Sequence, residues 1–288
     1  MLKVVQKFGF LLEFASCDLK NDRDVVLNTV TNDGTSLSFA SDDLKNDKEI
    51  TLRAIKKNGK VLEFVSEELK NDKDVVLAAV NQNGEALEFA STDLTNDLEV
   101  ILAAVNVNAR ALEYASDKLK NDKEVVMTAV MQSGYALAFA DEMIRGDQEI
   151  VFEAIKRNKS ALKYASKRLL SDKQFILEAV RLGCENVLQY APLDFANDKE
   201  FMLKAVQYNG IGVLGYSYVS HDKELVLEAV KNNGYALYSA VQGLRHDSEL
   251  QTEALKTNGF VWNYCDDLFL ERMQQCYYGA YLGTSGKV

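Results

Sequence analysis

Apolar and polar residues alternate in the same order along almost the whole chain, in stretches of 25 residues. In the stretch that starts at Asp72, the apolar run from Val75 to Val80 is followed by Asn83 and Gly84 and then by the segment EALEFASTDL. A period of this size predicts an array of repeats rather than one globular core. Each repeat begins at an aspartate, and successive ones are 25 residues apart except for one spacing of 26 and one of 24: Asp22, Asp47, Asp72, Asp97, Asp122, Asp147, Asp172, Asp198, Asp222 and Asp247.

Each repeat is predicted to contain two helices. Asn71 or Asp72 can cap the first helix, and an acidic residue at Asp74 suits its amino end. The run that follows is apolar nearly all round, so we expect neighbouring repeats to cover it on most sides. Gly84 should end this helix in a left-handed conformation. We predict that EALEFASTDL forms a second, shorter helix, because alanine and glutamate are common in it and β-branched residues are few.

Two positions keep their residue type from repeat to repeat and are predicted to form continuous buried columns. One is the leucine position of Leu27, Leu52 and Leu77, and the other is the aromatic position of Phe39, Phe64 and Phe89.

The net charge and the cysteine positions argue against several classes of function. The net charge is −10 over 288 residues, which argues against a surface that binds nucleic acid or an anionic membrane. The spacing of Cys17, Cys184, Cys265 and Cys276 fits neither a disulfide framework nor a metal site, and is typical of a reducing, cytosol-like compartment. No signal peptide or membrane-spanning segment is predicted, and a secreted protein is not excluded, so the localisation stays open.

The repeated run NDKEVVLxAVxxNGxALxFASxxLKN resembles the helical repeats of the family called domain of unknown function 4116. The resemblance covers residues 1–271. It implies a repeat array from a microbial eukaryote, or from a bacterium living inside one, and it implies no catalytic residues.

Two departures from the repeat favour structural explanations. His221 and His246, the two histidines of the chain, each precede a marker aspartate where other repeats have asparagine. About one repeat apart, at roughly 10 Å, they are too distant to share a metal ion. Residues 181–220 are irregular and contain Pro192. They are interpreted as a local bend of the array, with a hinge or binding loop as the alternative.

Two groups of side chains are candidates for binding a partner. The first is an acidic group next to the aromatic position, Glu63, Glu88 and Glu113, for which a solvated face is the simpler explanation. The second is an aromatic group at positions that are polar in most repeats: Tyr208, Tyr235, Tyr238 and Phe260. For the second group, an interface and an end cap are equally compatible with the sequence.

These observations predict an all-α, right-handed α-solenoid of about ten 25-residue two-helix repeats. Residues 1–21 form an amino-terminal half repeat, residues 22–271 form ten tandem repeats, and residues 272–288 form a carboxy-terminal capping helix and tail. We predict a non-enzymatic scaffold for protein or peptide partners of basic character, with no cofactor, no metal, no nucleic acid and no membrane. The alternative is a host-directed effector, or the targeting segment of a larger enzyme, and it rests on the resemblance alone.

Overall fold

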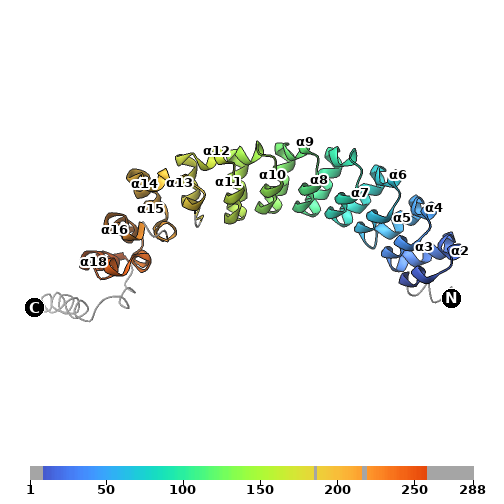
Figure 1. Ribbon diagram of the computed structural model, residues 1–288, viewed down its shortest axis with the longest axis horizontal. Coiled ribbons are helices and arrows are strands. Elements are labelled where there is room, and N and C mark those ends of the chain that lie inside the picture. Colours follow the sequence, from blue (N-terminus) through green and yellow to red (C-terminus); the bar gives the residue numbers. More distant parts are fainter. Residues whose placement is uncertain (1–8, 185–186, 216–218, 258–288) are drawn as a thin grey trace, which may run out of the picture. The chain divides into compact units, whose positions relative to one another are not determined.

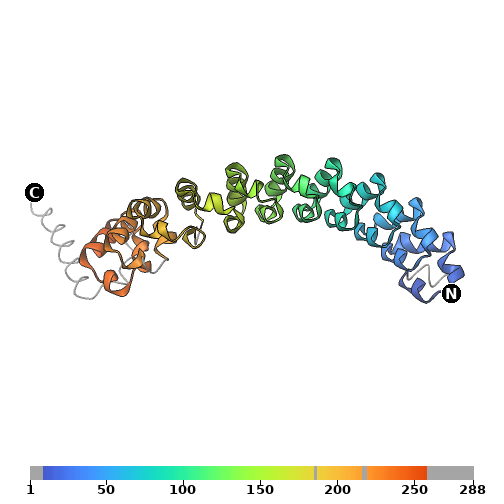
Figure 2. The same cartoon turned by 45° about the horizontal axis from the view of Figure 1, so that its top comes forward.

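The chain is an all-α array of repeats, as the sequence predicts. The computed structural model describes residues 9–184, 187–215 and 219–257, and every regular element within them is a helix. The chain divides at Ser166–Lys167 into two compact parts. In the first part, the long helices from α3 to α11 follow one another in chain order, and each packs on the next (Figures 1 and 2).

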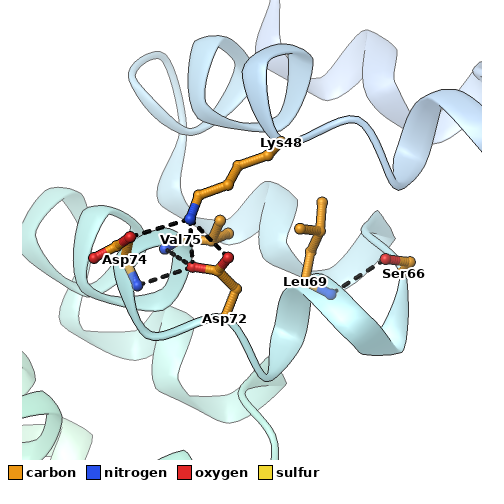
Figure 3. Close-up of polar contacts among 6 residues, drawn as sticks. All are labelled: Lys48, Ser66, Leu69, Asp72, Asp74 and Val75. Carbon is orange, nitrogen blue, oxygen red and sulfur yellow. Dashed lines mark hydrogen bonds and ion pairs between the residues drawn. The ribbon is translucent and has the colours of Figure 1, made fainter.

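Each of the ten marker aspartates directly precedes a long helix. In α7 the Asp72 carboxylate accepts hydrogen bonds from the amides of Asp74 at 3.0 Å and Val75 at 3.2 Å (Figure 3). The aspartate is therefore the cap, and the asparagine before it is not. The long helices of the first part are α3 (Arg23–Asn32), α5 (Lys48–Ile55), α7 (Lys73–Gln82), α8 (Leu98–Val107), α10 (Lys123–Gln132) and α11 (Gln148–Arg157). Those of the second part are α13 (Lys173–Arg181), α15 (Lys199–Leu214), α16 (Lys223–Asn232) and α18 (Ser248–Thr257).

The prediction of two helices per repeat is wrong, because the second segment is divided into two. In the repeat of Asp72, a six-residue 3-10 helix ends at Phe89, Ala90 is extended (φ −70°, ψ 156°), and a short helical turn follows. The 3-10 helices of the first part are η1 (Gly9–Phe14), η2 (Gly34–Phe39), η3 (Gly59–Phe64), η4 (Gly84–Phe89), η6 (Ala109–Tyr114), η7 (Gly134–Phe139) and η9 (Lys159–Tyr164). Its short turns are α2 (Cys17–Lys20), α4 (Asp42–Lys45), α6 (Glu67–Lys70), η5 (Leu94–Asn96), α9 (Asp117–Lys120) and η8 (Ile144–Gly146).

The second part contains the same kinds of element with more variation. Its remaining elements are α12 (Lys167–Leu170), η10 (Val187–Gln189), α14 (Asp194–Asn197), η11 (Val219–His221), η12 (Gly234–Ser239) and α17 (Gln242–Arg245). In the irregular segment 181–220, α15 continues through Asn209, whose backbone is not helical (φ −153°, ψ 78°). Gly183 has a positive φ of 79°. The bend predicted for this segment stays a prediction, and the predicted capping helix at 272–288 lies outside the described residues.

The predicted left-handed glycine is also wrong. The chain leaves α7 through Asn83 in an extended conformation (φ −150°, ψ 109°), and the Asn83 side chain accepts a hydrogen bond from the amide of Glu85 at 3.0 Å. Gly84 then begins the 3-10 helix. Its role is to allow close approach, since a Cβ atom there would lie 2.4 Å from the carbonyl oxygen of Ala104 in the next repeat.

The two predicted columns are not fully buried. Leu27, Leu52 and Leu77 are half-buried, and so are Phe39, Phe64 and Phe89. The core of the first part is formed instead by four residues of each long helix, such as Val75, Val76, Ala79 and Val80 in α7, and by the leucine in the middle of each 3-10 helix. In the first part that leucine is at most 1% exposed in every repeat: Leu12, Leu37, Leu62, Leu87, Leu112, Leu137 and Leu162. The aromatic residue lies two positions further along, where the 3-10 helix turns its side chain toward the surface.

Candidate interaction surface

The charged residues that recur in each repeat bind the next repeat. Lys48, the first residue of α5, places its Nζ 2.7 Å from Oδ2 of Asp72 and 3.1 Å from Oδ2 of Asp74 (Figure 3). The carboxylate that caps one helix therefore also binds a lysine of the preceding repeat. The equivalent ion pairs are Arg23–Asp47, Lys73–Asp97, Lys123–Asp147, Lys173–Asp198 and Lys223–Asp247.

These ion pairs stabilise the charged form of both partners. The hydrogen bond from Lys73 lowers the pKa of the Asp97 carboxyl group, with help from the amide of Val100 and against the effect of burial. Hydrogen bonds to Asp97 and Glu99 in turn raise the pKa of Lys73. The series is interrupted at Leu98, which is 44% exposed, and at Gln148, because these two residues occupy the lysine position. The series is thus a structural clamp between repeats that lacks its cation at Leu98 and Gln148.

A second set of recurring residues joins the short turns of successive repeats. The Ser91 hydroxyl donates to Oδ1 of Asn71 at 2.6 Å, and the Ser91 amide donates to the carbonyl oxygen of Lys70 at 3.0 Å. The same side-chain bond occurs in Ser41–Asn21, Ser66–Asn46 and Ser116–Asn96. His221 and His246 occupy the position of this asparagine. Within the described residues no group of three or more His, Cys, Asp or Glu side chains is arranged to hold a metal ion.

The variable residues lie on the 3-10 helices. In the first part η1, η2, η3, η4, η6, η7 and η9 pack on one another in that order, and we call this series the 3-10 row. The second residue of the 3-10 helix differs from repeat to repeat along the row: Phe10, Thr35, Lys60, Glu85, Arg110, Tyr135 and Ser160. Side chains at this position reach from one repeat to the next, because Lys60 Nζ lies 2.6 Å from Oε2 of Glu85.

The acidic candidate residues all lie on the 3-10 row but differ in their surroundings. Glu63 and Glu88 are exposed, and neither forms an ion pair with another residue of the described part of the chain. Glu113 is half-buried and binds Nε of Arg110 at 3.0 Å. The predicted group of three therefore contains two available carboxylates. The third carboxylate, that of Glu113, is paired with Arg110. The position of Arg110 three residues before Glu113 would have indicated this ion pair from the sequence.

The 3-10 row also carries an exposed aromatic cluster that was not predicted from the sequence. The ring of Tyr135 lies edge-on to Phe139 and to Tyr164 of the next repeat, with centroids 5.6 Å and 5.5 Å apart. Tyr135 is 46% exposed, and its hydrogen bond with Tyr164 raises its pKa. Lys163 places Nζ 4.7 Å above the Tyr164 ring. Tyr135 occupies the same position in its repeat as Tyr235, so the sequence feature that identified Tyr235 would also have identified Tyr135.

The aromatic candidates of the second part are exposed where the structure describes them. Tyr235 and Tyr238 lie three residues apart on η12, are 50% and 59% exposed, and Tyr238 is covered on one side by Arg245 at 5.4 Å. Tyr208 is 49% exposed on α15, which packs on η12. Phe260 lies outside the described residues. Ile211, 45% exposed, occupies the position of Tyr235 in the preceding repeat and was missed.

Two further features of the described residues bear on function, the cysteines and the hydropathy of the helices. Cys17 is exposed and Cys184 is buried, and neither forms a disulfide bond with a described residue. No helix among the described residues has the length and hydropathy needed to cross a bilayer.

Comparison with known proteins identifies the repeat. The family model described as "Domain of unknown function (DUF4116)" matches six times in tandem, at residues 1–45, 47–95, 97–145, 147–186, 182–221 and 222–270. Most of these matches span about two of the 25-residue repeats, which agrees with the helix boundaries. No curated protein and no solved structure matches the chain.

Proposed function

We propose, from the premise that this chain belongs to the family described as Domain of unknown function (DUF4116), that it is a scaffold for protein–protein interaction with no catalytic activity. The partner in this proposal is a protein or peptide of basic character. A net charge of −10 disfavours nucleic acid and anionic membranes as partners.

The observation that supports this role is the division between constant and variable residues. The constant residues, such as Lys48, Asp72, Ser91 and Asn71, are bound to neighbouring repeats and are not available to a partner. The second residues of the 3-10 helices differ in charge and size, and most are exposed. Arrays whose repeats contact only their neighbours present such extended surfaces for binding.

Two surfaces are candidates for binding the partner, and the affinity of each for the partner should depend differently on salt. Binding through Glu63 and Glu88 should weaken as salt rises, because exposed charges more than about 8 Å apart are screened at physiological ionic strength. Binding through Tyr208, Tyr235 and Tyr238 should persist, because burial of apolar surface is not screened. Salt titration of a purified complex therefore shows which surface the partner uses.

The test begins with affinity purification from the native cell with the full chain as bait. It continues with direct measurement of the affinity of each purified candidate. One variant replaces Glu63, Glu88 and Glu113 with glutamine, and another replaces Tyr208, Tyr235, Tyr238 and Phe260 with serine. Both should keep the circular dichroism spectrum of the wild type, and one of them should lose at least tenfold in affinity.

Two results would contradict the proposal. A confirmed partner that binds both variants with wild-type affinity would exclude these surfaces. A substrate turned over by the purified chain would exclude a purely structural role.

A further inference from the structure

The 3-10 row carries a regular series of partly exposed aromatic rings. The last residue of each of its seven helices is aromatic. Phe14 is 70% exposed, and the others are half-buried, so part of each ring remains accessible. The series is Phe14, Phe39, Phe64, Phe89, Tyr114, Phe139 and Tyr164.

The backbone of the row is already hydrogen-bonded, which limits the ways a partner can bind. In η4 the amide of Glu85 donates to the Asn83 side chain, that of Ala86 to the Asn83 carbonyl, and that of Ala90 to the Leu87 carbonyl. A partner strand therefore finds no open edge to extend. Recognition must come from side chains, as when aromatic surfaces bind extended proline-rich segments.

The spacing of the rings selects one partner conformation. Packed helices lie about 8–10 Å apart. The rings of Phe139 and Tyr164, which end successive 3-10 helices, are both in contact with the ring of Tyr135, and this agrees with such a spacing between them. A polyproline II helix repeats every three residues, or about 9 Å. A β-strand returns to the same face after about 7 Å. An α-helix does so after seven residues, or about 10.5 Å, and falls out of register over several repeats.

The negative charge of the row indicates that the partner has basic side chains. The exposed Glu63 and Glu88 directly precede the rings of Phe64 and Phe89, and residues 9–166 contain 28 acidic against 19 basic residues. The row itself contains a cation on a ring, since Lys163 Nζ lies 4.7 Å from the centre of Tyr164. A basic side chain from a partner would gain the same cation–π contact and a carboxylate beside it.

We propose that the 3-10 row binds a proline-rich segment in the polyproline II conformation, with a basic residue at every third position. This proposal rests on the interaction role given above and names the partner chemistry of that surface. The rings of η3, η4 and η6 bind successive turns of the segment, and Glu63 and Glu88 bind its basic residues. Lys163 ends the favourable stretch, because it occupies the glutamate position in η9.

The test uses the full chain and a fluorescent peptide of six Lys-Pro-Pro triplets, followed by fluorescence anisotropy at low salt. The control peptide has the same composition with all six lysines at one end, and a second control has glutamate in place of lysine. We expect the triplet peptide to bind at least tenfold more tightly than the grouped peptide, and the acidic peptide not to bind. Equal affinity for the triplet and grouped peptides would overturn the proposal, and so would no binding of either.

A matched pair of variants locates the site. Glu63→Gln with Glu88→Gln should weaken binding of the triplet peptide at least fivefold. Glu124→Gln with Glu149→Gln removes the same charge, also from exposed residues 25 positions apart, but from the first turns of the long helices α10 and α11 and not from the row. An equal loss in both variants would mean that general attraction, not the row, binds the peptide.

Failure of this proposal is distinguishable from failure of the scaffold role. A natural partner that requires Glu63 and Glu88 while the triplet peptide does not bind would leave the scaffold role in place and overturn the polyproline II segment.

Discussion

At the scale of single residues, the glycine that begins most of the six-residue 3-10 helices shows how a recurring residue allows the next repeat to pack closely. At Gly34, Gly59, Gly84, Gly134 and Gly234 an added Cβ atom would lie 2.3–2.5 Å from the carbonyl oxygen of the alanine in the next long helix. Glycine and alanine therefore recur together because the 3-10 helix of one repeat lies against the long helix of the next. The sequence indicates that both positions are constrained, but it does not show that they meet.

Gly84→Ala should destabilise the chain by about 1–3 kcal/mol, because the new methyl group meets a backbone carbonyl that moves only with its helix. The natural alanine at Ala109 indicates that the array can adjust to this change, so the variant should still fold. Gly243→Ala is the matched control, since nothing lies within 4 Å of its added Cβ atom in α17. The control should be neutral or stabilising by up to about 1 kcal/mol. Denaturant titration of both variants measures the difference, and an equal effect would disprove the close-contact explanation.

At the scale of helices, the sequence located the long helices well and the shorter segments poorly. All ten long helices begin immediately after the predicted aspartates, because side-chain capping is a local property. The 3-10 helix and the short turn were merged into one helix, since apolar spacing over ten residues does not separate them. The partial exposure of Phe89 was missed because it depends on the 3-10 geometry, whereas the pairing of Glu113 with Arg110 was open to prediction from their spacing of three residues. The exposure of Tyr208, Tyr235 and Tyr238 was predictable, because polar residues occupy those positions elsewhere.

One of the lysines missing from the clamp between repeats can be restored at Leu98. Leu98→Lys should place an ammonium group near Asp122 and Glu124, as Lys48 lies near Asp72 and Asp74. The expected gain is about 0.2–1 kcal/mol, typical of exposed ion pairs. Leu98→Gln controls for removal of the exposed leucine. A gain that is the same for both variants, or that persists in 1 M salt, would show that no ion pair had formed.

The existing clamps make stability depend on pH in a defined direction. The pKa of Asp97 is lowered in the folded chain, above all by the hydrogen bond from Lys73. The stabilisation is therefore complete above the ordinary aspartate pKa of about 3.9 and is lost as the pH falls through the lower, folded value. Lys73→Met should lower the denaturation midpoint at pH 7 and have a smaller effect at pH 2.5. An effect of equal size at both pH values would mean that Lys73 contributes through packing alone.

At the scale of the whole chain, a repeat is exchangeable because the main contacts between the described elements join adjacent repeats. Deleting Lys73–Asp97 joins Asp72 to Leu98, so Lys48 again faces an aspartate cap, and the glycine of η3 faces the alanine of α8. We expect this variant to keep a cooperative thermal transition and to lose about one tenth of its helical signal, since one of ten repeats is removed. Deleting Lys73–Glu85 removes about half as many residues but puts every later contact out of phase at the junction. That variant should lose cooperativity or aggregate. If the deletion of Lys73–Glu85 is tolerated better than the deletion of Lys73–Asp97, the 25-residue period does not determine how the repeats pack. The proposed interaction surface, which depends on that period, would then be wrong as well.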